Sequence, residues 1–536
     1  MSRGLLLALV GALLIIRLPS LAQPMGSDQG LYAYVGERIR HGEIAYRDAW
    51  DQKPPGIHYV YAALRAASPR DLIVPAADLA AAALVAALVW AIGSRIGGPL
   101  GGGLSAVAFL LLSDPGLGRL GGVRVRAQSE TFIALAVSGA LALALGAKGA
   151  RGASGAVRLV AAGLMLGAAF ALKYNAGLYV LVVLFALAAT RGVALLDVIW
   201  IAAGALVIPL ALLAVFWRGG ALNDLYQATI TYNLLYSSET YAGRWDMVRY
   251  LVTFPMQHAR VDGLWFAGGL GCLVLTGAGL WTPARRGLGE GGPGHRRLGG
   301  GAWLPVAWVG IACLSIAING SRNLPQYFVQ AAPALALAAG VAAAIALPAL
   351  PAIARGIAVL IVAVGVWRAG DDPFPKLARN VWHDTQYLIG RIDRRTHLAS
   401  YGGARDSDKY SALDNRDIGA FLSSKTRPDE TVFVFGYSPG SYVYANRRSA
   451  SRFFWSRPVI LDFDRQDPRY GVAGLRADLE RNRPAYVVLQ RHDWSPDVQD
   501  SGPFFMSQPL LADWLRAAYH EVPIVEGFDA WERNTR

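Results

Sequence analysis

The sequence predicts a polytopic α-helical membrane protein followed by a C-terminal soluble α/β domain. Hydrophobic residues make up 54% of the 536 positions and charged residues only 17%, a composition in which the average residue prefers hydrocarbon to water. Hydropathy then falls sharply near Gly370, and the remaining chain has the length and composition of an ordinary soluble domain. We therefore expect a membrane domain at 1–369 and an α/β domain at 370–536.

About eleven apolar runs follow one another along the membrane domain. A transmembrane helix needs roughly 17–25 predominantly apolar residues, and several of the runs are shorter than that. In hydrocarbon every backbone N–H and C=O must be satisfied within its own segment, so we expect each run to be a helix. The runs are 4–22, 76–95, 101–113, 131–147, 159–172, 177–190, 195–217, 263–281, 303–318, 331–347 and 357–367.

The basic residues of the short loops predict the topology, because they collect on the cytoplasmic side. With the N-terminus inside, nearly all short basic loops fall inside. The exception is 114–130, which falls outside although it carries Arg119, Arg124 and Arg126. One interpretation is that a span is miscounted or that these arginines are merely surface residues. The other is that the arginines hold an anionic group at the outer face. An odd number of spans places the chain after 367 outside a cell (inner or plasma) membrane.

Net charge and cysteine content bear on which partners and cross-links the protein can have. The net charge of +13 does not indicate a nucleic-acid partner, because many of the arginines are loop anchors. Cys272 and Cys313 both fall in predicted spans, which leaves neither a disulfide framework nor a cysteine metal cluster. An alternative for the first run is a cleaved signal peptide, since small residues occur at 19–23.

The C-terminal domain has the pattern of a small strand and helix sandwich. Buried strands are expected at 431–436 and 485–490, and helical spacing occurs at 472–482 and 510–519. The segment 436–440 is rich in glycine but lacks the lysine of a phosphate-binding loop.

The first outer loop, expected at 23–75, is the most informative part of the sequence. It carries Asp28, Asp51 and Lys53, the last followed by a Pro54-Pro55 pair that stiffens the chain. A carboxylate can take the proton of an acceptor hydroxyl, and a cation at headgroup depth can stabilise a leaving phosphate. The loop therefore indicates chemistry on a lipid-borne phosphate. Asp51, with its neighbour Asp48, is the alternative acid, although both could simply cap helices.

Further polar residues sit at the ends of predicted spans. Glu130 begins one span and Lys173 ends another, and charges at such depth are functional hypotheses by default. A lysine can also simply extend its amine toward the interface. The outer loop 319–330 adds Arg322, Tyr327 and Gln330.

The order of these features resembles the GT-C glycosyltransferases of the family 39 type, the group of protein O-mannosyltransferases and aminoarabinose lipid A transferases. The features are the Asp28 loop, Lys53-Pro-Pro-Gly56, Ser129-Glu-Thr-Phe132, a span that ends in lysine, the Tyr327 loop and Phe435-Gly-Tyr-Ser-Pro439. The likeness covers most of the membrane domain and, more loosely, the C-terminal domain.

The resemblance implies an inverting transfer of a sugar from a polyprenyl-phosphate donor, on the outer side of the membrane. It implies that Asp28 is the general base and that Lys53 neutralises the donor phosphate. Glu130 would be a second acid that orients substrate. Further cations for the phosphate would come from Arg124, Arg126, Lys173 and Arg322, and substrate contacts from Asp51, Tyr327 and Gln330.

Two departures from the family pattern matter. The family commonly has Asp-Glu where this chain has Asp28-Gln29, which weakens the case for a divalent metal, and no metal ligand or certain cofactor is assigned. It commonly has His-Tyr where this chain has Gln326-Tyr327.

A transporter or flippase of a lipid-linked or small anionic substrate is the alternative function, although the acids of a transporter would usually lie near mid-span. The sugar, the acceptor and the oligomeric state do not follow from the sequence.

Overall fold

The chain divides into two compact units, each assembled from three separate stretches of sequence. The computed structural model describes residues 2–147, 152–238, 240–287, 300–403, 408–464 and 467–534. The first unit comprises Met1–Leu21, Pro75–Ala214 and Leu235–Trp382, and the second comprises Ala22–Val74, Val215–Leu234 and His383–Arg536. Most of the stretch expected as the first outer loop thus belongs, by its contacts, to the second unit.

The first unit is a bundle of long apolar helices. All eleven predicted apolar runs coincide with or overlap its helices, and within the described residues eight helical segments are long and apolar enough to cross a membrane, with two shorter apolar ones besides. The protein is therefore a multi-pass membrane protein. The helices are α1 (Arg3–Ile16), α4 (Ile73–Leu112), α5 (Ser129–Gly146), α6 (Ala153–Leu172), α7 (Val180–Thr190), α8 (Leu195–Arg218), α12 (Gly263–Gly287), α13 (Trp303–Ile318), α14 (Ala332–Ala349) and α15 (Ala352–Ala369).

Shorter helices connect the long ones. They are η1 (Leu18–Ala22), η2 (Pro115–Leu117), η3 (Arg119–Gly122), η5 (Tyr174–Tyr179), α10 (Tyr232–Ser238), α11 (Arg244–His258), η8 (Gly300–Ala302), η9 (Pro325–Ala331) and α16 (Pro373–Leu388). The segment 114–130 thus contains two short 3₁₀ turns, η2 and η3.

Helix α4 contains two of the predicted apolar runs, 76–95 and 101–113. Its 40 residues are interrupted at Gly98, where φ is +70°, directly before Pro99. At 1.5 Å per residue a helix of this length extends about 60 Å, twice the roughly 30 Å of a hydrocarbon core. The break at Gly98 separates the two apolar runs, while the total number of spans stays a prediction.

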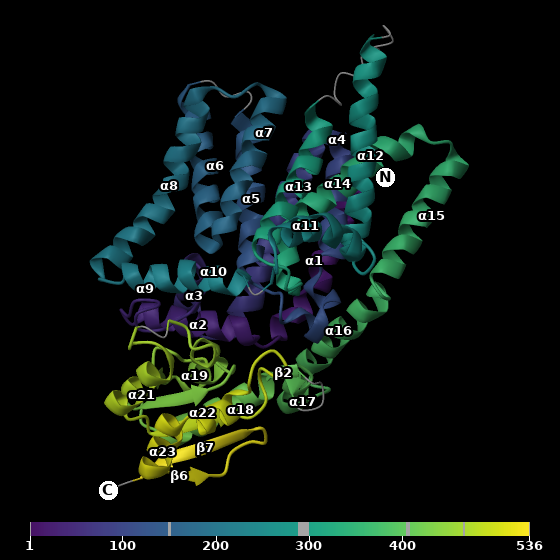
Figure 1. The fold of residues 1–536 in the computed structure, drawn as a ribbon. Helices are drawn as coiled ribbons and strands as arrows, with labels where there is room; N and C mark the ends of the chain where they lie inside the picture. Colours follow the sequence, from purple (N-terminus) through teal and green to yellow (C-terminus); the bar gives the residue numbers. More distant parts are fainter. Residues whose placement is uncertain are drawn as a thin grey trace. The chain divides into compact units, whose positions relative to one another are not determined.

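Helices α6 and α8 pack closely through small residues, and Figure 1 shows them side by side. A Cβ at Gly163 of α6 would lie 2.0 Å from the Ile201 carbonyl oxygen of α8, and a Cβ at Gly204 of α8 would lie 2.0 Å from the Val160 carbonyl oxygen of α6. Only glycine allows backbones to approach so closely. Membrane helices associate mainly through such packing, because lipid offers no hydrophobic driving force.

The second unit contains a five-stranded mixed sheet with the order β4-β3-β5-β7-β6. Strand β3 (Thr431–Phe435) runs parallel to β4 (Arg448–Ser449) and β5 (Tyr486–Gln490), whereas β7 (Phe528–Arg533) is antiparallel to β5 and β6 (Tyr519–Val522). The two predicted strands are therefore confirmed as β3 and β5, the buried centre of the sheet. The predicted helices are confirmed as α21 (Gly471–Asn482) and α23 (Pro509–Ala518).

Further elements surround this sheet. The helices are α2 (Ser27–Arg40), α3 (Gly56–Ala67), α9 (Leu222–Tyr226), the π-helical turn η6 (Gln227–Thr231), α17 (Arg394–Ala399), α18 (Ala412–Lys425), α19 (Gly440–Ala445), α20 (Arg457–Ile460) and α22 (Ser501–Ser507). Strands β1 (Gly402–Gly403) and β2 (Asp408–Ser411) form a small antiparallel pair.

Helices α2 and α3 lie against each other in parallel. The Tyr32 ring of α2 contacts His58 and Tyr61 of α3 at centroid distances of 6.0 and 5.3 Å. One turn further along α2, a Cβ at Gly36 would lie 2.7 Å from the backbone nitrogen of Ala62. Because later positions in α2 meet later positions in α3, the N-terminal ends of the two helices lie at the same end of the pair.

A second close approach joins α2 to α19. A Cβ at Gly30 would lie 2.9 Å from the backbone nitrogen of Gly440 and 3.0 Å from its Cα. Deeper in this contact the Tyr34 ring lies 4.9 Å from Tyr442 and 4.5 Å from Phe454. The two glycines thus bring the start of α2 against the loop that follows β3.

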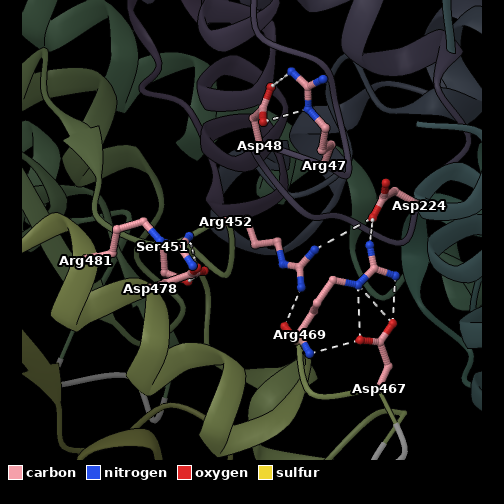
Figure 2. A network of polar contacts seen from close by, with 9 residues as sticks. All are labelled: Arg47, Asp48, Asp224, Ser451, Arg452, Asp467, Arg469, Asp478 and Arg481. Atoms are coloured by element: carbon pink, nitrogen blue, oxygen red, sulfur yellow. Dashed lines mark hydrogen bonds and ion pairs between the residues drawn. The ribbon is translucent and has the colours of Figure 1, made fainter. Parts of the chain in front are cut away.

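An ion-pair network fastens α9 to the loops after β4 (Figure 2). The buried carboxylate of Asp224 lies 3.7 Å from an Arg452 nitrogen and 3.4 Å from an Arg469 nitrogen, and Arg469 also pairs with Asp467 at 2.7 Å. Among the described residues two cations balance two carboxylates, so the buried Asp224 carboxylate has cationic partners. The segment 215–234 is thereby held within the second unit.

We expect Gly30→Ala to destabilise the protein, because the new methyl group would meet backbone atoms that cannot move independently. Overpacking of this kind costs about 1–3 kcal/mol, which thermal unfolding of the purified protein in detergent would detect. Gly11→Ala is the matched control, since a Cβ there has no neighbour within 4 Å. Equal midpoints for the two variants would contradict the close α2–α19 contact.

Candidate active site

Asp28 lies in the first turn of α2, two residues after the N-cap Gly26. The Gly26 backbone N–H donates to the Gln29 side-chain oxygen at 2.5 Å, which fixes the start of the helix. A carboxylate in this turn is stabilised by the positive end of the helix dipole. The Tyr437 hydroxyl donates a hydrogen bond to one Asp28 oxygen, so the orientation of the carboxylate is defined.

Tyr437 is itself held firmly in the loop between β3 and α19. Its backbone N–H donates to the side-chain oxygen of Gln490 at 2.8 Å, and its ring lies 4.8 Å from the ring of Trp494. Burial, reinforced by the adjacent Asp28 carboxylate, raises the pKa of Tyr437 well above its ordinary value. The phenol therefore stays protonated and remains a hydrogen-bond donor to Asp28.

Contacts of the loop before α3 restrain the backbone around Lys53. The Tyr46 hydroxyl donates to the Lys53 carbonyl at 2.7 Å, and the Asn233 amide donates to the neighbouring Gln52 carbonyl at 2.7 Å. Asp51 is fully buried and lies 3.2 Å from the His58 Nε2 atom. These contacts and the Pro54-Pro55 pair fix the position from which the lysine extends.

In the first unit, Glu130 and Lys173 form a buried ion pair. Glu130 is in the first turn of α5, Lys173 follows the last residue of α6, and the Lys173 Nζ lies 2.6 Å from a Glu130 oxygen. The same ammonium lies 4.2 Å from the centroid of the Tyr327 ring, a cation–π contact that is strengthened by desolvation. Lys173 thus contacts two other predicted site residues, Glu130 and Tyr327.

Gln330 extends this polar cluster toward α7 and α13. Its amide oxygen accepts hydrogen bonds from the Tyr179 hydroxyl at 3.0 Å and the Ser315 hydroxyl at 2.9 Å, while its amide nitrogen donates to the Tyr327 carbonyl at 2.9 Å. Asn175 donates to the Ser315 carbonyl at 2.7 Å. Because Gln330 is buried and accepts and donates at once, it orders the start of η9.

The side chains of Arg126 and Arg322 have partners within the first unit, where Arg124 has a backbone contact. Arg126 lies 3.4 Å from Asp78, and the Arg124 carbonyl accepts from the Gln128 amide at 3.0 Å. The Arg322 guanidinium lies 3.8 Å from the centroid of the Tyr236 ring. Whether these side chains also hold an anion stays a prediction.

A cavity of about 550 Å³ lies in the first unit. Its wall is mainly apolar, with Phe109, Trp265 and Phe328 among its lining residues, but it also includes Asp78 and Asp114. Asp114 pairs with Arg17 at 3.0 Å, and Asp78 pairs with Arg126. An apolar hollow with a few fixed polar groups is typical of a ligand site.

Sequence reasoning did not assign three of the groups around these residues. His58 becomes recognisable only through its contact with Asp51. Tyr437 belongs to the motif Phe435-Gly-Tyr-Ser-Pro439, but its contact with Asp28 is supplied by the fold. Asp78 could have been recognised from the sequence. It is a charged residue inside the apolar run 76–95, and an acid in such a run usually has a partner.

The architecture is that of the GT-C fold, with a multi-pass helical part, helices after the first apolar helix and a C-terminal α/β part.

No protein-family model matches the sequence, and no curated protein matches it. Among solved structures, ArnT from Cupriavidus metallidurans in the apo state matches at 16% identity and TM-score 0.58, covering 98% of this chain and 97% of that chain. ArnT bound to undecaprenyl phosphate matches at 15% identity and TM-score 0.56, covering 99% and 98%. This chain and ArnT therefore share their fold over nearly their full lengths.

We expect Lys173→Met to destabilise the protein by about 3–5 kcal/mol, because it leaves the buried Glu130 carboxylate without its partner. The double variant Glu130→Gln with Lys173→Met removes both charges and should recover much of that loss. Thermal unfolding of the wild type and the two variants in detergent measures both effects. A double variant no more stable than the lysine variant alone would show that the pair does not determine stability.

Proposed function

We propose that this protein is an inverting glycosyltransferase that moves a sugar from a polyprenyl-phosphate donor to an acceptor hydroxyl at the outer face of the membrane. The observation that carries the proposal is the parallel packing of α2 and α3. It sets Asp28, in the first turn of α2, and Lys53, just before α3, at the same end of one helix pair. An acid and a cation are the two groups that this displacement requires.

In the proposed reaction Asp28 is the general base. The acceptor oxygen forms a bond to the anomeric carbon while the bond from that carbon to the phosphate oxygen breaks, and the acceptor proton passes to Asp28. The phosphate leaves with the electron pair and needs no proton, so one acid suffices and the configuration inverts. Tyr437, which donates to one Asp28 oxygen, holds the base in place.

The donor phosphate is proposed to bind near Lys53. The N-terminal ends of α2 and α3 add the positive ends of two helix dipoles, so negative charge that grows on the leaving phosphate is stabilised there. The donor class has independent support, because the solved structure of ArnT with the same fold contains undecaprenyl phosphate. We place the C-terminal α/β part on the same, outer side of the membrane.

The predicted site residues of the first unit take supporting roles in this proposal. Lys173 and Arg126 are each paired with a buried carboxylate, so we assign the main charge neutralisation to Lys53. Phosphate contacts by Arg124 and Arg322 stay a prediction from the sequence. Glu130 would orient substrate while Lys173 fixes its position. Other predicted contacts are Tyr327, Gln330 and Asp51, the last positioned by His58.

We expect Asp28→Asn to lower transfer by about 10²–10⁴-fold, the usual contribution of a general base, and Lys53→Ala to abolish most activity by removing the phosphate partner. The assay is sugar transfer from a panel of radiolabelled polyprenyl-phosphate donors to endogenous acceptors in membranes that contain each variant.

Matched controls are Asp429→Asn and Lys425→Ala. Asp429 is largely exposed and Lys425 lies in the last turn of α18, so both should retain activity. Transfer that survives Asp28→Asn would move the base to Asp51 or Glu130. No transfer from any donor by the wild type would favour a transporter or flippase instead.

We expect Tyr437→Phe to lower kcat several-fold with little change in donor KM, because the phenylalanine keeps the ring contact with Trp494 but loses the hydrogen bond to Asp28. Initial rates as a function of donor concentration separate the two constants. Tyr444→Phe is the control for loss of a buried phenol, since its hydroxyl bonds Asp71 instead. A rise in KM alone would assign Tyr437 to donor binding.

A further inference from the structure

A cluster of metal-ligand side chains lies where α16 ends and α17 begins. His383, Asp384 and His397 each offer a ligand atom, and these atoms lie within 4.8 Å of one another. Asp384 and His397 are almost fully buried. All three residues belong to the second unit, and the reaction proposed above does not use them.

The hydrogen bonds of His397 define which of its nitrogens is available. Its Nε2 lies 3.2 Å from the carbonyl oxygen of Ala22, an acceptor, so Nε2 carries the proton and the lone pair is on Nδ1. Among the described residues Nδ1 has no hydrogen-bond partner, although it is buried. An unsatisfied buried acceptor is costly, and native structures usually supply a partner.

The same reasoning applies to His383. The Ser400 hydroxyl donates its proton to the His397 carbonyl at 2.7 Å, so its oxygen accepts from His383 Nε2 at 2.7 Å. The lone pair of His383 is therefore also on Nδ1. The two imidazole rings are nearly parallel, with 5.2 Å between centroids and an interplanar angle of 13°.

Asp384 is held as a ligand carboxylate is usually held. One oxygen accepts from the Gln23 amide at 2.7 Å, and the other accepts from the Tyr401 hydroxyl. Metal-ligating groups are commonly oriented by such hydrogen bonds, with the second nitrogen of a ligating histidine donating to a backbone carbonyl. Here all three candidate ligands have an orienting partner of this kind.

We propose that His383, Asp384 and His397 bind a divalent transition metal ion, with zinc as the ion their chemistry favours. Two imidazoles and a carboxylate form a common zinc ligand set, completed by a water molecule in a tetrahedral arrangement. Metal bonds of about 2.0–2.2 Å draw the three donor atoms closer together. The ion gives the orphaned His397 nitrogen its partner.

The expected role of the ion is structural. The candidate ligands lie on α16 and α17, while their partners Ala22 and Gln23 begin the segment that leads into α2. An ion at this point would fasten the start of the segment that carries Asp28 to the chain that follows the last apolar helix. The inference does not depend on the proposed transfer reaction, and its test needs no sugar donor.

The test is zinc binding by the full-length protein in detergent. Metal-free protein is equilibrated in zinc-buffered solution, and bound zinc is measured by mass spectrometry for the wild type, His383→Gln and the control His492→Gln, whose side chain is 83% exposed. We expect one zinc per chain in the wild type and the control, and loss of that zinc in His383→Gln. Tyr401→Phe, which removes only the hydroxyl that orients Asp384, should weaken binding by about 10- to 100-fold.

A spectroscopic measurement on the wild type avoids reliance on variants that fail to fold. Co²⁺ at this site should show the visible absorption of a four-coordinate ion, and added zinc should displace it. No stoichiometric zinc in the wild type, equal zinc in wild type and His383→Gln, or a purely six-coordinate Co²⁺ spectrum would each overturn the proposal.

Discussion

The parallel contact between α2 and α3 is the constraint on which the candidate site depends. A helix pair joined by a short turn is normally antiparallel, so a parallel pair needs a long connection, here residues 41–55. That connection carries Lys53 back to the end where α2 begins. Gly36 permits the contact because its missing Cβ leaves room for the backbone of α3. Without the parallel contact between α2 and α3, Asp28 and Lys53 would not lie at the same end of the helix pair.

The elements that could be predicted from the sequence are those determined by the residues of a single continuous segment. Long apolar runs became helices because unpaired backbone groups are not tolerated in hydrocarbon, and β3 and β5 were recognisable as buried apolar strands. Helices α2 and α3 were not predicted, since their polar surroundings resemble a loop. Their apolar faces show only when Tyr32 meets Tyr61 and Tyr34 meets Tyr442.

The candidate site was predictable in its residue types and less so in its pairings. Asp28 and Lys53 stand out in sequence because they lie in a loop with a recognisable pattern, but the partner of Asp28 is 409 positions away. Glu130 and Lys173 were each noticed as a charge at a span end, and their mutual pairing follows from the packing of α5 against α6. A charge buried in a low-dielectric interior needs an oppositely charged partner. That partner can be distant in sequence, so no local sequence pattern reveals the pair.

The interleaving of the two units sets an order for biosynthesis. Residues 22–74 are made early, yet most of their partners in the second unit follow about 300 residues later. At ribosomal rates of about 5–20 residues per second, this segment waits about 20–70 s for β3 and α19, which begin at 431 and 440. During that time the faces of α2 that carry Tyr34 and Gly30 remain uncovered. The second unit can therefore be completed only after the C-terminal stretch has been synthesised.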